Sequence, residues 1–125
     1  MRQGLLTEIL GLSIDEKMEL INRVQMSIEG TDGVRSVELL DIYVDVTGRK
    51  VKLFSRDRED VWAKAMVAYR MFNEGYTVSE ISRQMFKNHS TVIHYRQKME
   101  DALSVPQAYQ DIIPIWNEFQ KRIEL

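Results

Sequence analysis

Apolar residues in the first third of the chain recur at spacings of three and four, which is the pattern of amphipathic helices. Two such faces are present: Leu5, Leu6, Ile9 and Leu12, followed by Met18, Ile21, Val24 and Ile28. Between them, Ser13 and Glu16 have the spacing of a capping box, and Gly30 ends the second face. We therefore predict two helices in an N-terminal extension that spans residues 1–34.

Residues 36–54 carry a pattern that fits either a β-hairpin or a helix. As a strand, the segment would alternate with Leu40, Ile42, Val44 and Val46 on one side. As a helix, it would have a broad apolar face made of Val37, Leu39, Leu40, Tyr43, Val44 and Val46. In the helical interpretation Gly48 is the C-terminal cap. Periodicity leaves both interpretations open.

From about residue 59 the pattern is helical. A wide stripe that reaches about residue 74 consists of Val61, Trp62, Ala65, Met66, Ala68, Tyr69 and Phe72. Both tryptophans of the chain lie on apolar stripes, so we expect core positions for them. Gly75 ends this helix, and Thr77 and Glu80 then form a second capping box that starts a short helix through Met85.

The last segment, residues 105–125, predicts an amphipathic helix. Its apolar positions are Tyr109, Ile112, Trp116, Phe119 and Ile123. Pro106 stops the preceding helix, whereas Pro114 either kinks the last helix or begins it. We expect this stripe to cover the core of its own domain, and a homodimer contact is the alternative.

Composition places the chain among single-domain globular proteins. Its 125 residues are 44% hydrophobic and 29% charged. In the helical interpretation of residues 36–54, the pattern predicts an all-α fold of six or seven helices. The absence of cysteine excludes disulfides and thiolate metal sites. No apolar run reaches the length of a membrane span and no signal peptide precedes the domain, so we expect a cytoplasmic protein without membrane contact.

The sequence offers no arrangement for catalysis or metal binding. His89 and His94 lie five residues apart, which places them about 140° from each other around a helix, so the two cannot share one ion. Ser90 follows His89 directly, and nothing positions a third group for nucleophilic chemistry. We expect a protein that is not an enzyme and has no cofactor, no metal and no small-molecule substrate.

Charge is unevenly distributed although the net charge is only −2. Residues 1–46 carry nine acidic and four basic side chains, and residues 100–125 carry five acidic and two basic ones. Residues 47–99, in contrast, carry eleven basic and five acidic side chains. A basic middle between acidic ends is typical of a protein with one face for a polyanion, although a solvated basic face has the same composition.

The centre of the basic region has the layout of a helix-turn-helix. A short helix over 78–85 is followed by a break at 86–88 and by a longer helix from 89 to about 103, with Asn88 as its N-cap. We expect the two helices to pack through Ile81, Ser82, Met85 and Val92. The first turn of the second helix then presents four short hydrogen-bonding side chains, Asn88, His89, Ser90 and Thr91.

Four segments of this region also resemble one family. The run Lys87-Asn88-His89-Ser90-Thr91-Val92-Ile93-His94 is similar to the signature of the DNA-binding C-terminal domain of the bacterial replication initiator DnaA. Residues 56–64 resemble that family's basic loop and following helix start, and residues 77–81 and 43–48 resemble further segments. The resemblance covers about half the chain and implies a helical domain over 35–104, with residues 36–47 as a helix.

The resemblance implies roles in binding double-stranded DNA for nine residues. Arg56 and Arg58 would enter the minor groove from the basic loop. Five residues would lie at the major groove: Lys87, Asn88, His89, Ser90 and Thr91. Lys64 and Lys98 would contact phosphates, which fix the register of the protein on the duplex.

The chain departs from the family pattern at several positions. Phe86 stands where the family has glycine, with one residue fewer in the turn, and Tyr95 replaces a small residue. Asn88 replaces the commoner aspartate, and an amide suits adenine better than cytosine. No phosphate-binding loop of the form G-x-x-x-x-G-K-[ST] is present, which indicates a free-standing relative of the module without the ATPase domain.

From these features we expect sequence-selective binding of double-stranded DNA, without catalysis, in the regulation of replication or transcription in a bacterium, phage or mobile element. The alternative is an adaptor that binds another protein through its apolar C-terminal helix, with the helix-turn-helix as a relic.

Overall fold

The computed structural model describes residues 34–125, and the helices predicted before residue 34 lie outside them. The described part is all-helical and contains no strand. Its elements are α3 (Val34–Thr47), α4 (Arg58–Asn73), α5 (Val78–Met85), α6 (His89–Ser104), the 3-10 turn η1 (Pro106–Ala108) and α7 (Ile113–Ile123). The all-α prediction is confirmed.

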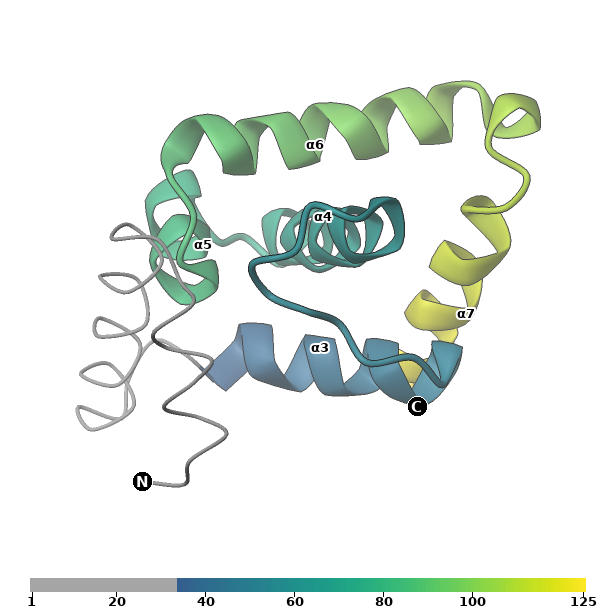
Figure 1. Ribbon diagram of the computed structural model, residues 1–125, viewed down its shortest axis with the longest axis horizontal. Helices are drawn as coiled ribbons and strands as arrows, with labels where there is room; N and C mark the ends of the chain where they lie inside the picture. The colour runs from purple at the N-terminus through teal and green to yellow at the C-terminus, as the bar shows by residue number, and fades with distance from the viewer. Residues whose placement is uncertain (1–33) are drawn as a thin grey trace.

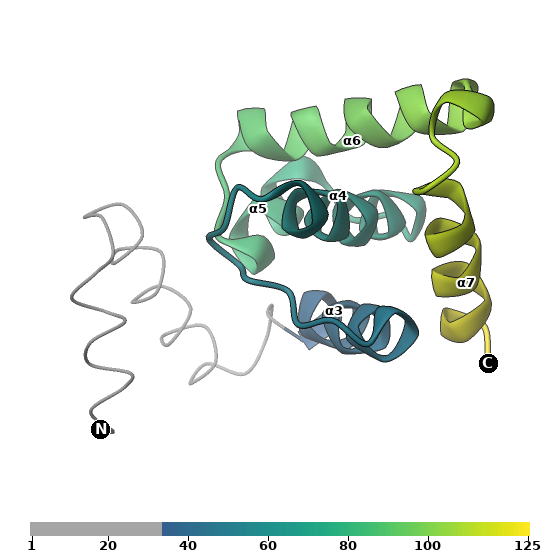
Figure 2. The same ribbon diagram turned by 45° about the vertical axis from the view of Figure 1, so that its right-hand side comes forward.

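Helix α4 lies in the middle of the molecule (Figure 1). Helices α3 and α6 pack on opposite sides of it, while α5 and α7 lie at opposite ends (Figures 1 and 2). Residues on every side of α4 are therefore buried: Asp60, Trp62, Ala63, Lys64, Ala65, Met66, Val67, Ala68 and Met71. Its three buried alanines leave room for the larger side chains of the surrounding helices.

Tertiary packing makes residues 34–47 a helix and excludes the hairpin. Leu39 and Tyr43 are buried, and the Tyr43 ring meets the edge of Phe119 on α7 with 5.6 Å between centroids. Gly48 ends the helix with a φ of 68°, and its N–H donates to the carbonyl of Val44 at 2.7 Å. A glycine adopts this left-handed conformation without steric cost, so the predicted C-terminal cap is confirmed.

Helix α7 begins at the second proline. Pro114 occupies the first turn, where its missing N–H has no partner to lose. Ile112, Trp116 and Phe119 are buried, and α7 packs on α3. The apolar stripe of residues 105–125 thus covers the core of its own helical domain, as expected.

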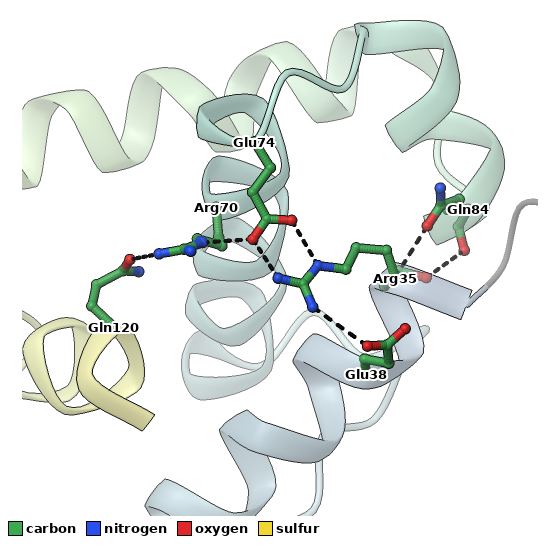
Figure 3. Close-up of polar contacts among 7 residues, drawn as sticks. Arg35, Glu38, Arg70, Glu74, Gln84 and Gln120 are labelled. Atoms are coloured by element: carbon green, nitrogen blue, oxygen red, sulfur yellow. Dashed lines mark hydrogen bonds and ion pairs between the residues drawn. The ribbon is translucent and has the colours of Figure 1, made fainter. Parts of the chain in front are cut away.

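A cluster of polar side chains joins the ends of four helices on one side of the molecule (Figure 3). Glu74, just after α4, accepts from Arg35 of α3 (Nε–Oε1 2.6 Å) and from Arg70 of α4 (Nε–Oε2 2.7 Å). Arg70 also donates to Gln120 of α7. These bonds, that of Arg35 foremost, lower the pKa of Glu74. Hydrogen bonds from the backbone N–H and hydroxyl of Ser36 to Gln84 extend the cluster to α5.

Candidate nucleic-acid interface

The helix-turn-helix forms as the sequence predicts. Thr77 and Glu80 close the capping box: the Thr77 hydroxyl accepts from the Glu80 N–H at 3.2 Å, and the Glu80 carboxylate accepts from the Thr77 N–H at 3.1 Å. That backbone hydrogen bond is the main reason that the pKa of Glu80 is lowered. The four residues expected between the two helices are all buried, namely Ile81, Ser82, Met85 and Val92.

The turn between α5 and α6 contains a strained residue. Phe86 has a φ of 57°, the left-handed region that favours glycine, and among residues 34–125 it alone has this conformation without being a glycine. Its side chain is 8% exposed, so burial of the ring offsets the backbone cost. The N–H of the next residue, Lys87, donates to the Ser82 carbonyl at 3.1 Å. The turn thus closes with phenylalanine where the resemblance implies glycine.

The first turn of α6 faces solvent. Asn88, His89 and Ser90 are exposed, Thr91 is half-buried, and Val92 behind them is in the core. Asn88 is the N-cap, as predicted, and its Oδ1 accepts from the Thr91 N–H at 2.8 Å. Because that bond turns the amide oxygen back toward the helix, the NH2 group is the part of Asn88 directed to a ligand. A contact of the same oxygen with the amino group of adenine, the base that an amide suits better than cytosine, would compete with the cap.

The basic loop, residues 48–57, passes beside this turn. It leaves α3, crosses the face of α4 and comes close to the connection between α5 and α6 (Figures 1 and 2). At that point the Nζ of Lys87 lies 5.3 Å from the centroid of the Phe54 ring. Arg56, two residues further on, is exposed. The cationic loop and the exposed start of α6 therefore belong to one surface.

Lys98 of α6 lies toward the start of α4, where the basic loop ends. Its Nζ is 4.3 Å from the centroid of the Trp62 ring on α4, and the residue is half-buried. Arg96, in contrast, lies over Phe72 and pairs with Glu100 at 2.9 Å. Of the two cations in this part of α6, Lys98 is the one placed toward the start of α4 and the basic loop.

The structure contradicts the role expected for Lys64. Its side chain is buried, with 2% exposed, and its Nζ donates to the carbonyls of Leu53 (2.9 Å) and Ser55 (2.7 Å). A group held in this way cannot reach a phosphate without leaving the core. The sequence of residues 56–64 did not reveal the burial of Lys64, because an amphipathic pattern predicts one buried stripe. In the folded protein α4 has buried residues on every side, and Lys64 is one of them.

Arg58 points to another part of the molecule. It pairs with Asp111, just before α7, at 2.8 Å, and this hydrogen bond is the main cause of the lowered pKa of Asp111. The minor-groove role that the resemblance gives Arg58 would require this pair to open. At the start of α4, Arg49 of the loop pairs with Glu59 (3.3 Å) and Asp60 (3.7 Å).

Two further exposed residues of this surface were not singled out from the sequence. Lys52 adds a cation to the loop, and Ile93, 53% exposed, lies one turn after His89 on α6. Ile93 could have been found from the sequence, because a residue four positions after His89 lies on the same face of a helix.

Within residues 34–125, no three His, Cys, Asp or Glu side chains lie close enough to hold a metal ion. No helix in this range is long and apolar enough to cross a membrane. Comparison with protein-family models, curated proteins and solved structures found no match to this chain. The likeness to the DnaA domain therefore rests on the sequence motifs alone.

Proposed function

We propose that this protein binds double-stranded DNA with sequence preference and catalyses no reaction. The observation that carries the proposal is the contact between Lys87 and Phe54, because it brings the basic loop beside the exposed first turn of α6. A helix start with short polar side chains and a neighbouring cationic loop are the two parts that such a protein needs, one for each groove.

In this proposal α6 enters the major groove with its N-terminus first. His89, Ser90 and Thr91 contact base edges, and the NH2 group of Asn88 donates to a base or phosphate acceptor. Arg56 enters the adjacent minor groove, where a narrow A·T-rich segment attracts a guanidinium. Lys87 lies beside them at the major groove, and Lys98 contacts a phosphate, which fixes the register of α6.

The biological setting follows from the resemblance to the DnaA DNA-binding domain. We place the protein in the regulation of replication or transcription, in a bacterium, phage or mobile element. Such a protein works where the DNA is, in the cytoplasm and on the nucleoid.

Selection from a pool of random duplexes, followed by sequencing of the retained fraction, tests the proposal. We expect an enriched motif and an affinity whose logarithm falls with the logarithm of salt concentration at a slope near −0.9 for each phosphate contact. The control is Lys121→Ala, which removes one positive charge from the exposed side of α7 and should leave the motif unchanged. An absence of duplex binding even at low salt would reject the proposal and favour the adaptor alternative.

A further inference from the structure

Two buried charged residues of α4 lie directly behind the basic loop. Asp60 is 1% exposed and Lys64 is 2% exposed, and they are one helical turn apart. Taking a charged group out of water is costly unless it is paired or hydrogen-bonded. These residues therefore need partners, and the loop provides them.

Each charged group binds the loop backbone at a different point. The Nζ of Lys64 donates to the carbonyls of Leu53 and Ser55, at 2.9 and 2.7 Å. One carboxylate oxygen of Asp60 accepts from the N–H of Lys52 at 3.2 Å. The Arg49 guanidinium lies 3.7 Å from the same oxygen. The backbone that leads to Arg56 is thus bonded to α4 at three residues, Lys52, Leu53 and Ser55, and the side chain of Arg49 adds an ion pair.

Hydrogen bonds inside the loop fix the backbone on both sides of Arg56. The N–H of Ser55 donates to the Lys52 carbonyl at 3.2 Å, and the N–H of Asp57 donates to the Ser55 hydroxyl at 3.0 Å. Arg56 lies between these bonds with its side chain exposed. The loop is therefore organised up to the residue that extends into solvent.

Carbonyls of a surface loop can be satisfied by water, so a buried ammonium is not required for that purpose. Its specific effect is to restrict the backbone before any ligand arrives. A preorganised loop loses less conformational entropy on binding than a free one, and its side chains bind more tightly for that reason.

We propose that Lys64, supported by Asp60, is a positioning residue that holds the basic loop in the conformation in which Arg56 enters the minor groove. Lys64 acts on DNA through Arg56 and does not touch the nucleic acid. This inference rests on the proposed function, and it differs from the phosphate contact that the resemblance implies for Lys64.

A double-mutant cycle tests the inference. The proteins are the wild type, Lys64→Met, Arg56→Ala and the double variant, each measured by fluorescence anisotropy against the selected duplex. We expect K64M to weaken binding by about tenfold in the wild-type background, and by less than about twofold when R56A is also present. Equal losses in the two backgrounds would overturn the inference, because Lys64 would then act independently of Arg56.

Amide hydrogen exchange on the free protein gives a readout that does not depend on DNA. K64M should speed exchange of the N–H groups of Lys52 and Ser55 by about tenfold or more, while amides in the middle of α6 stay protected. Unchanged exchange in the loop would contradict the inference. If the wild type bound no duplex, the proposed function would fail, and the exchange data would still decide whether Lys64 orders the loop.

Controls separate positioning from loss of stability. Arg70→Met removes a largely buried charge from the other end of α4, and it should lower the melting temperature without changing the affinity for DNA. If circular dichroism shows that K64M does not fold, Lys64→Gln takes its place, since it keeps a donor for one carbonyl. The expected loss for K64Q is smaller than for K64M and again depends on Arg56.

Discussion

Arg58 at the start of α4 donates to Asp111, just before α7, over a distance of 2.8 Å. Both side chains are more than half exposed, at 56% and 59%, so the pair contributes little to stability. It does hold a guanidinium of the basic region against the acidic C-terminal segment.

Asp111→Asn should therefore release Arg58 and strengthen DNA binding. We expect the affinity at low salt to rise by a few fold and the salt slope to steepen by about 0.9, which corresponds to one added phosphate contact. The melting temperature should stay close to that of the wild type, because both side chains of the pair are exposed. The matched control is Glu118→Gln, which makes the same charge change beside Lys121. An equal gain in both variants would show that net charge alone is responsible.

Arg56→Ala and His89→Ala test the two groove contacts. Each should cost on the order of 1–3 kcal/mol of binding free energy to the selected duplex and relax the preference for the bases it contacts. Binding to duplexes that differ at single positions would locate each contact. A uniform loss across all duplexes would contradict base recognition by His89.

Lys98→Met should weaken binding to all duplexes to a similar extent, since a phosphate contact has no sequence preference. Methionine keeps an apolar stem over Trp62 and removes the charge, so this variant isolates the electrostatic effect. The salt slope should fall in magnitude by about 0.9. A loss confined to one sequence would show that Lys98 acts in another way.

Phe86 permits a test of backbone strain in the turn. Phe86→Ala keeps a side chain in the left-handed conformation and loses the buried ring, whereas Phe86→Gly loses the ring and the strain together. Both variants should be less stable than the wild type, with F86G more stable than F86A by about 1 kcal/mol in urea unfolding. The reverse order would mean that the turn changes conformation in the variants.

Glu74 should make stability depend on pH in the acidic range. Its pKa in the folded protein lies below the ordinary value of 4.5, chiefly because Arg35 donates to it. A lowered pKa gives stability that is present above about pH 4.5 and is lost as the pH falls through the folded value. Glu74→Gln should therefore be less stable than the wild type at pH 7, by about 1–3 kcal/mol.

The melting temperatures of E74Q and the wild type should converge as the pH is lowered to 3. Protonation removes the charge from Glu74 in the wild type, and E74Q has no charge there to lose. A constant difference over this range would show that the arginines do not depend on the charge of Glu74.

Local signals predicted the helical elements of the described region well. The Thr77 and Glu80 capping box, the Asn88 cap and the stop at Gly48 each depend on bonds within a few residues, so short sequence patterns specify them. The segment 36–47 was ambiguous by periodicity, because its apolar residues satisfy two periods. Packing of Leu39 and Tyr43 against α4 and α7 decides for the helix.

In the candidate site, too, some features depend on neighbouring residues and others on tertiary packing. The helix-turn-helix, its polar first turn and the presence of a basic loop can be predicted from the sequence, since these are properties of neighbouring residues. Which cations remain on the surface depends on the folded chain: Lys64 turns inward to the loop carbonyls, and Arg58 turns to Asp111. Burial and ion pairing involve groups 9 to 53 positions away in the chain, and no local pattern records these contacts.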